Sequence, residues 1–146
     1  MDQFDHALLD RMQRNNLTPA RQLGEEVGLS ESAVLRRLRR LRATGVIVAD
    51  VSIVRPASRG RPLNTIVLVS MVREGRTQVE AFLAHLQRRP EVANAWYVTG
   101  VADFVVLLNL ADMAEYKTFI DEVFLSDPNI GKFETLMSLR ELASAP

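Results

Sequence analysis

The sequence predicts an α+β protein, with a helical N-terminal domain and a C-terminal domain in which strands and helices alternate. Three observations support this fold class. Apolar residues recur at helical spacing near the N-terminus, prolines, a glycine and arginines interrupt the pattern at residues 55–62, and short apolar runs follow from Thr65. We therefore expect domains at residues 1–54 and 65–146, joined by a linker at residues 55–64.

The N-terminal domain is expected to contain three short helices with a tight turn between the second and the third. Asp2 can cap the first helix, and Thr18, which stands before a proline, can cap the second. Gly28 ends the second helix and Ser30 caps the third, so only Gly28, Leu29 and Ser30 separate the two helices. Two helices joined by a tight turn that contains glycine form the helix-turn-helix pattern.

A strand is expected directly after the third helix. Residues 46–54 are rich in valine and isoleucine, which favour strands, and Gly45 closes the preceding helix. A strand in this position would make the N-terminal domain winged-helix-like.

The C-terminal domain is expected to fold as a ferredoxin-like βαββαβ unit. Strands are predicted at residues 65–73, 93–99, 103–111 and 130–142. A capping box of Thr77 and Glu80 starts one intervening helix, and Asp112 can cap the other. This element order predicts a four-stranded antiparallel sheet with both helices on one face.

The other face of the predicted sheet would have no helices to cover it. We expect its apolar residues to include Leu68, Trp96, Val106 and Leu108. Because a large exposed apolar patch marks an interaction site, this arrangement predicts self-association.

The formal net charge of the chain is zero, with 18 basic and 18 acidic residues, but the charge is unevenly distributed. Residues 1–64 contain eleven arginines against seven acidic residues, a net charge of +4, so the remainder carries −4. A basic half joined to an acidic half indicates that one half meets a polyanion.

Composition excludes several classes of protein. The hydrophobic fraction of 47% and charged fraction of 25% are those of a folded globular chain, not of a disordered one. The chain has no cysteine, which excludes a disulfide framework and thiolate metal sites. With no signal peptide pattern and no apolar stretch of membrane-spanning length, we expect a soluble cytoplasmic protein.

The third predicted helix contains five arginines within residues 36–42. Its apolar residues fall at positions i, i+4 and i+7 and are expected to face the core. At about 100° per residue, Arg36, Arg40 and Ser32 then lie on the far side of the helix, and Arg37 flanks them. The outer face of this helix is therefore predicted to be basic.

A basic helix of this kind can enter the major groove of DNA, where arginines contact phosphates or guanines and short polar groups contact the groove near the helix N-terminus. The second helix of such a motif crosses the DNA backbone. The residues predicted to contact double-stranded DNA are Thr18, Arg21, Ser30, Ser32, Arg36, Arg37 and Arg40. The alternative is a basic face that is merely solvated or forms salt bridges, the role expected for Arg39 and Arg42.

Two blocks of sequence resemble the Lrp/AsnC (leucine-responsive, feast/famine) transcriptional regulators. The first block comprises Leu29-Ser30, Ser32, Val34, Arg37, Leu38, Leu41 and Gly45-Val46-Ile47. The second comprises Pro90-Glu91-Val92, the segment Tyr97 to Phe104, and Thr135. The resemblance implies a homodimer formed through the ferredoxin-like half, further assembly into higher oligomers, and an amino acid bound between subunits.

The resemblance also implies where the small-molecule effector binds. The residues that match the family's effector pocket are Thr99, Gly100, Val101, Ala102, Asp103 and Thr135. Gly100 would allow close backbone approach, and Asp103 could accept a hydrogen bond from an α-ammonium group. The alternative is a hairpin turn in which Asp103 only caps the turn. Relatives often have a polar group inside this loop, where Val101 and Ala102 supply none, so we expect the effector to differ from theirs or to be absent.

The sequence therefore predicts a DNA-binding transcriptional regulator modulated by an amino acid or related metabolite, without catalysis, cofactor or metal. Two alternatives remain open. One is an enzyme similar to the sirohaem decarboxylases, which use the same scaffold, although His6 and His85 do not suggest a tetrapyrrole pocket. The other is a ligand-sensing adaptor that binds protein instead of DNA.

Overall fold

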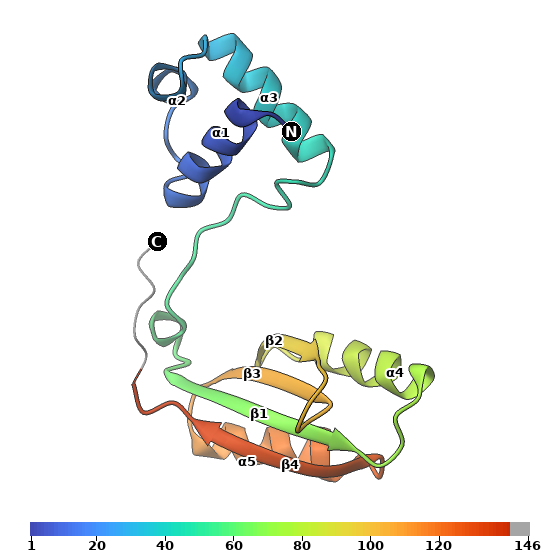
Figure 1. The fold of residues 1–146 in the computed structure, drawn as a ribbon. Coiled ribbons are helices and arrows are strands. Elements are labelled where there is room, and N and C mark those ends of the chain that lie inside the picture. Colours follow the sequence, from blue (N-terminus) through green and yellow to red (C-terminus); the bar gives the residue numbers. More distant parts are fainter. Residues whose placement is uncertain (141–146) are drawn as a thin grey trace. The chain divides into compact units, whose positions relative to one another are not determined.

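The computed structural model describes residues 1–140, which fold as two units divided between Ile53 and Val54 (Figure 1). Residues 141–146, including the predicted end of the last strand, lie outside the described residues. Among the described helices, none is long and apolar enough to cross a membrane.

The first unit contains the three predicted helices: α1 (Gln3–Arg14), α2 (Ala20–Val27) and α3 (Glu31–Ala43). Gly28 ends α2 in the left-handed conformation, with φ of 75°, and Ser30 caps α3 by accepting a hydrogen bond from the Ala33 amide. The helices pack around a core of fully buried apolar side chains, Leu8, Leu23, Val34, Leu38 and Leu41. The helix-turn-helix prediction is confirmed.

Two details of the first unit differ from prediction. Thr18 does not cap α2, because its hydroxyl instead donates to the carbonyl of Asn15 at 3.0 Å and closes the turn after α1. Pro19 is the N-cap residue, without a side-chain hydrogen bond.

The predicted strand at residues 46–54 is wrong. Ile47 packs against the helical core, but the side chains of Val48 and Ile53 are 90% and 96% exposed. None of the described strands pairs with this segment, so its backbone has no ladder partner. Strand propensity alone does not stabilise an unpaired strand, and the first unit therefore has no wing among the described residues.

Up to residue 140, the second unit contains four strands, two helices and a short 3₁₀ helix at Pro56–Arg59. The strands are β1 (Leu63–Met71), β2 (Val92–Tyr97), β3 (Phe104–Leu110) and β4 (Ile130–Met137). The helices are α4 (Arg76–Gln87) and α5 (Met113–Phe119), which continues as a π-helical segment over Ile120–Leu125. The sheet order is β2-β3-β1-β4 with antiparallel neighbours, as predicted for a βαββαβ unit (Figure 1).

The two helices of the second unit have different N-cap residues. Asp112 caps α5 by accepting a hydrogen bond from the Glu115 amide, as predicted. The predicted capping box at Thr77 is wrong because the N-cap of α4 is Gly75, two residues earlier. Glu80 instead accepts a hydrogen bond from Arg76 at 2.8 Å.

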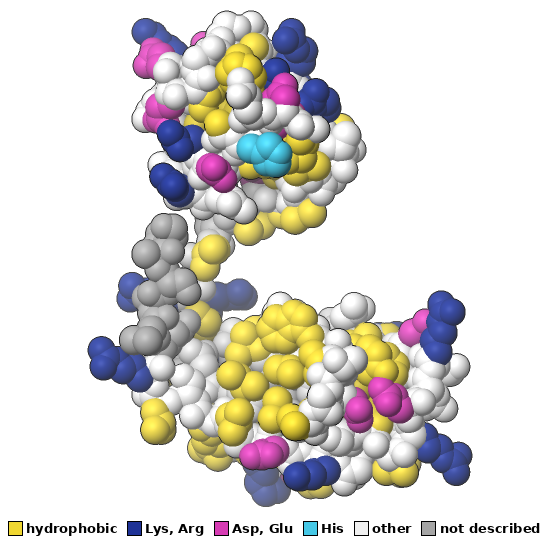
Figure 2. Space-filling model, viewed as in Figure 1, with side chains coloured by type: hydrophobic (Ala, Val, Ile, Leu, Met, Phe, Trp, Pro, Cys, Tyr) yellow, Lys and Arg dark blue, Asp and Glu magenta, His cyan; other side chains and the backbone are white. Residues whose placement is uncertain are grey.

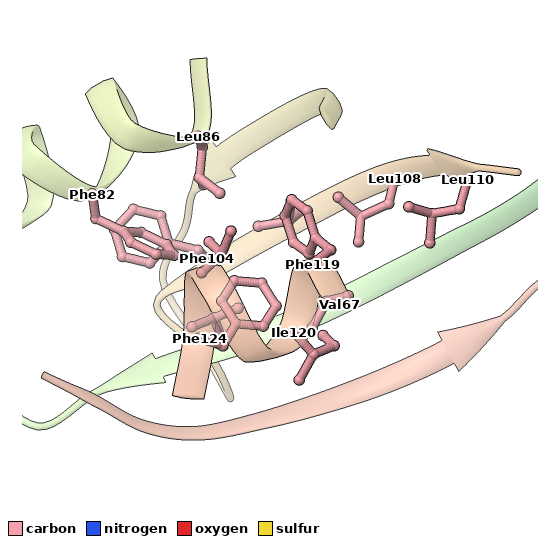
Figure 3. Close-up of a cluster of buried hydrophobic side chains, with 12 residues drawn as sticks. Val67, Phe82, Leu86, Phe104, Leu108, Leu110, Phe119, Ile120 and Phe124 are labelled. Atoms are coloured by element: carbon pink, nitrogen blue, oxygen red, sulfur yellow. The ribbon is translucent and has the colours of Figure 1, made fainter. Parts of the chain in front are cut away.

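Helices α4 and α5 cover one face of the sheet, and aromatic side chains fill the space between (Figure 3). Phe82 of α4 lies edge-on to Phe104 of β3, with ring centroids 4.9 Å apart. Phe119 and Phe124 meet in the same way at 5.5 Å. Burying aromatic side chains in edge-to-face contact contributes about 0.5–1.5 kcal/mol per pair beyond the area removed from water.

The uncovered sheet face carries two of the four predicted residues, Leu68 and Trp96, but not Val106 and Leu108. Val106 and Leu108 are fully buried beneath the helices, because they alternate along β3 in phase with Phe104. Hydrophobic side chains gather over the strands in Figure 2. Those that lie on the uncovered face are Ile66, Leu68, Trp96, Val105, Leu107 and Leu136.

A buried carboxylate joins α1 to α3 in the first unit. The Asp5 side chain is only 1% exposed and forms ion pairs with Arg37 at 2.8 Å and Arg40 at 2.5 Å. Asp5 also completes a capping box with Asp2, since each carboxylate accepts the other residue's amide at 3.0 Å. These amide hydrogen bonds, together with Arg37, lower the pKa of both carboxyl groups below the ordinary value.

Lowered carboxyl pKa values make the first unit sensitive to acid. The contribution of Asp2 and Asp5 to stability is present above about pH 3.8 and is lost as pH falls through their folded-state pKa values. We expect the free energy of unfolding, followed by urea titration of the helical circular dichroism, to fall between neutral pH and about pH 3. The fall should be smaller in Asp5→Asn, and an equal fall in this variant would contradict the assignment.

Gly24 allows the tight turn between α2 and α3. It is buried in α2, and a Cβ at this position would clash with the carbonyl oxygen of Leu29. We expect Gly24→Ala to destabilise the first unit by about 1–3 kcal/mol, since backbone must move to admit the methyl group. The control Glu25→Ala should cost less than about 0.5 kcal/mol.

The same helical circular dichroism can follow the effect of Gly24→Ala, while fluorescence reports separately on the second unit through Trp96, the only tryptophan of the chain. An unchanged helical transition in Gly24→Ala would show that the turn relaxes without cost.

Candidate functional site

The arginines of α3 surround a hollow of about 190 Å³ that is lined by Arg36, Arg37 and Arg40, here called the arginine hollow. Arg36 is exposed and makes no hydrogen bond or ion pair with the described residues. The Arg40 side chain is 54% exposed although it pairs with Asp5. Positive charge therefore reaches solvent along one side of α3, as the helical spacing predicts.

Arg37 differs from the prediction of an outward-facing side chain. It is only 20% exposed, and its Nη1 atom donates to the carboxylates of Asp2 and Asp5 at 2.8–3.0 Å. Its guanidinium carbon lies 5.5 Å from the ring centroid of Phe4, within cation–π range. The first turn of α1 lies against α3 at this point, which the helical spacing of α3 alone does not reveal. The hydrogen bonds that Arg37 donates to Asp2 and Asp5 raise the pKa of Arg37 above its ordinary value.

The remaining residues predicted to contact DNA lie at the starts of α2 and α3. Ser30 and Ser32 are exposed, and their hydroxyl oxygens are 3.2 Å apart at the N-terminus of α3. Arg21 is exposed on α2 and pairs with Glu25 at 3.2 Å, a surface contact that another anion can replace. The hydroxyl and the amide of Thr18 both donate to the carbonyl of Asn15 in the preceding turn, at 3.0 and 3.3 Å.

The other two arginines of the cluster, Arg39 and Arg42, differ in their contacts. Arg42 forms a two-bond ion pair with Asp50, at 2.8 and 3.0 Å, so its predicted salt-bridge role is confirmed. Arg39 is exposed and has no ion pair with the described residues.

The turn between β2 and β3 contains the predicted effector residues Thr99–Asp103. Gly100 has φ of 135°, a conformation that favours glycine. The Asp103 carboxylate accepts a hydrogen bond from the Met71 amide at 2.6 Å, and the Asp103 amide donates to Val69 at 2.9 Å. Asp103 therefore ties the turn to β1, whatever else it contacts.

A second hollow, of about 110 Å³, lies on the uncovered sheet face beside this turn. It is lined by Leu68, Ser70, Val101, Ala102, Lys132 and Glu134, and is here called the sheet hollow. Lys132 and Glu134 lie two residues apart on β4 and so point to the same face. They are exposed and opposite in charge, and neither forms an ion pair with the described residues.

Thr135 lies on the opposite side of the sheet from this hollow. It pairs with Val67 across the β1–β4 ladder, and its hydroxyl is 2.8 Å from the hydroxyl of Tyr116 on α5. Within one chain, the structure therefore brings Val101 and Ala102 together with Lys132 and Glu134, and it separates all four from the Thr135 side chain.

Sequence reasoning missed three charged residues that belong to these sites. Asp5 could have been found as the third residue after an aspartate N-cap, the position of a capping-box partner. Lys132 and Glu134 could have been found from their alternation with apolar Phe133 along the last strand.

The two histidines offer no sign of a cofactor or metal site. His6 and His85 are exposed on helices of different units. Over residues 1–140, no group of three or more His, Cys, Asp or Glu side chains is arranged to hold a metal ion.

Comparison with known proteins gives a consistent result for both units. Residues 1–42 match the AsnC-type helix-turn-helix domain, and residues 64–146 match the Lrp/AsnC ligand binding domain. The chain is 43% identical to an uncharacterized HTH-type transcriptional regulator of Sinorhizobium fredii, over 94% of this chain and 81% of the relative. It is 30% identical to the leucine-responsive regulatory protein of Haemophilus influenzae, over 97% and 86% of the two chains.

Solved structures show the same fold. A transcriptional regulator of Neisseria meningitidis in complex with L-Met has a TM-score of 0.89 at 27% identity, covering 99% of this chain and 93% of that one. An AsnC family regulator of Agrobacterium tumefaciens has a TM-score of 0.90 at 20% identity, covering 99% and 94%. With a basic helix-turn-helix unit joined to a ferredoxin-like unit, and family matches across both, the chain belongs to the Lrp/AsnC family of helix-turn-helix transcriptional regulators.

Proposed function

We propose that this regulator binds double-stranded DNA sequence-specifically through α3, acts in the cytoplasm, and responds to an amino acid or related metabolite bound at its ferredoxin-like unit. In this role it catalyses no reaction and needs no cofactor. The observation that carries the proposal is the arginine hollow, an exposed basic site on the second helix of a helix-turn-helix pair.

The candidate residues differ in which of their side-chain groups remain available to contact DNA. Arg36 and Arg40 offer guanidinium groups for phosphate or guanine contact, and Ser30 and Ser32 lie at the end of α3 that approaches base edges. Arg21, with Thr18 before it, starts the helix that crosses the backbone. The ion pairs of Arg37 favour an anchoring role for that residue.

The uncovered sheet face supports a homodimer, which can assemble further into a higher oligomer. Trp96 and Leu136 are 45% and 46% exposed on this face, and a second copy of the chain would remove them from water. In a dimer with twofold symmetry the two copies of α3 would contact half-sites about 10 bp, or a multiple of that, apart.

The sheet hollow supports binding of an α-amino acid. Lys132 can pair with the carboxylate and Glu134 with the ammonium group, while Leu68 and Val101 contact an apolar side chain. The relative from Neisseria meningitidis, which is complexed with L-Met, is consistent with this ligand class. In this proposal the turn Thr99–Asp103 forms one wall of the binding site. Thr135 influences the site indirectly from the other face of the sheet, or a Thr135 from a partner subunit contributes to it.

We expect Arg36→Ala and Arg40→Ala to weaken binding to a duplex selected by the wild-type protein from a random-sequence library. Each loss of a phosphate contact should also reduce the slope of log K against log salt by about 0.9. The control Arg76→Ala removes an arginine that is 90% exposed in the second unit, and should leave the slope unchanged. Filter binding or fluorescence anisotropy across a salt series measures both quantities.

Unchanged slopes in both variants would remove these residues from the DNA interface. Failure of the wild-type protein to bind or select any duplex would contradict DNA binding itself and would favour an adaptor that binds protein.

We expect at least one of the twenty amino acids to raise the melting temperature of the wild-type protein, since a ligand at 100 times its Kd adds about 2.7 kcal/mol. Lys132→Gln and Glu134→Gln should abolish this shift while changing the melting temperature of the free protein little, because both side chains are exposed. Lys117→Gln, which breaks only a surface pair with Asp121, is the matched control.

A shift that survives both substitutions would place the effector outside the sheet hollow. Asp103→Asn is expected to lower the melting temperature even without ligand, because it weakens the hydrogen bond to Met71.

A further inference from the structure

We propose that Asp5 of α1 is a positioning residue of the DNA interface, which acts through Arg40, and that Arg37 anchors α3 to α1 without contacting DNA. This inference rests on the proposed contact between α3 and DNA. It assigns to the first helix a role that lies outside the two helices of the helix-turn-helix pair.

Asp5 is held in one geometry from three directions. One carboxylate oxygen accepts from Arg37 Nη1 at 2.8 Å, and the other accepts from Arg40 Nη2 at 2.5 Å and from the Asp2 amide at 3.0 Å. The side chain is 1% exposed, so DNA phosphates cannot meet it directly. A buried carboxylate remains charged only while such partners stay in place. The positions of Asp5, Arg37 and Arg40 therefore depend on one another.

Arg40 uses one terminal nitrogen for Asp5 and keeps its other donors available. Its side chain remains 54% exposed and lines the arginine hollow. A free arginine loses rotamer freedom when it binds a phosphate, and this loss of entropy weakens binding. Because Asp5 already restricts the rotamers of Arg40 in the folded protein, less conformational entropy is lost when Arg40 binds a phosphate.

Arg37 is more buried than Arg40 and forms more ion pairs. Its Nη1 atom contacts both oxygens of Asp2 as well as Asp5, its guanidinium group lies over Phe4, and only 20% of the side chain is exposed. Moving it towards DNA would break the ion pairs and leave Asp5 buried with one fewer charged partner. Its contribution is therefore to hold α1 against α3.

The charges at the arginine hollow support the same division. Three arginines line the hollow, and Asp2 and Asp5 pair with two of them, which leaves a net charge of +1 at this place. A single phosphodiester group carries the matching charge. The hollow is therefore suited to one backbone phosphate, held by Arg36 and Arg40.

The test compares two variants of the full-length protein that remove the same charge from α1. Asp5→Asn removes the buried carboxylate, and Asp10→Asn removes an exposed one that has no ion pair with the described residues. Both variants gain one unit of positive charge, which by general attraction would strengthen DNA binding. The probe is a duplex selected by the wild-type protein, with a scrambled duplex for non-specific affinity.

We expect Asp5→Asn to weaken binding to the selected duplex by roughly tenfold and to reduce its preference over the scrambled duplex, despite the added charge. Asp10→Asn should bind as tightly as the wild type or slightly more tightly. In an Arg40→Ala background, Asp5→Asn should have less than about a twofold further effect, because its influence passes through Arg40. Arg37→Ala should leave the salt slope unchanged, whereas Arg36→Ala reduces it.

Tighter binding by Asp5→Asn, or an equal effect with and without Arg40, would overturn the positioning role while leaving DNA binding by α3 intact. Absence of any DNA binding by the wild type would overturn both proposals together. For the case in which Asp5→Asn fails to fold, the side-chain Nε–H resonances of the wild-type protein supply a second test. On addition of the duplex, the Arg36 and Arg40 signals should shift and that of Arg37 should not, and a shift of Arg37 as large as that of Arg40 would overturn the assignment.

Discussion

A carboxylate removed from water needs charged partners, and Asp5 finds them in Arg37 and Arg40 on the neighbouring helix. This contact joins α1 to α3 and at the same time decides which arginines of α3 reach solvent. Without it, Arg36, Arg37 and Arg40 would lie together with no acidic partner, and neighbouring guanidinium groups would repel one another. With it, Arg37 is anchored while Arg36 and Arg40 stay exposed, and the arginine hollow becomes a defined basic site.

In the second unit, the alternation of side chains across the sheet has a comparable effect. Phe133 and Thr135 point towards the helices, where Thr135 meets Tyr116, while Lys132 and Glu134 point to the uncovered face. The same strand therefore contributes both to the aromatic core and to the sheet hollow. A register shift of one residue would exchange these roles and destroy both.

Asp103 has a structural role that is compatible with the proposed ligand binding. Its carboxylate and amide both bond to β1, so the turn that carries Val101 and Ala102 is fixed against the sheet. These hydrogen bonds support the alternative that Asp103 stabilises the turn. Ligand contact by its free carboxylate oxygen and turn closure by the bonded one are compatible in the same residue.

The sequence by itself determined several features that depend on near neighbours along the chain. These are the caps at Asp2, Ser30 and Asp112, the glycine at the tight turn, and the order of strands and helices in the second unit. Tertiary structure decided what depends on distant partners. Residues 46–54 have strand propensity but no strand to pair with, and Val106 faces the helices because of the phase of β3. Arg37 turns inward because α1 supplies two carboxylates, and helical periodicity carries no information about a neighbouring helix.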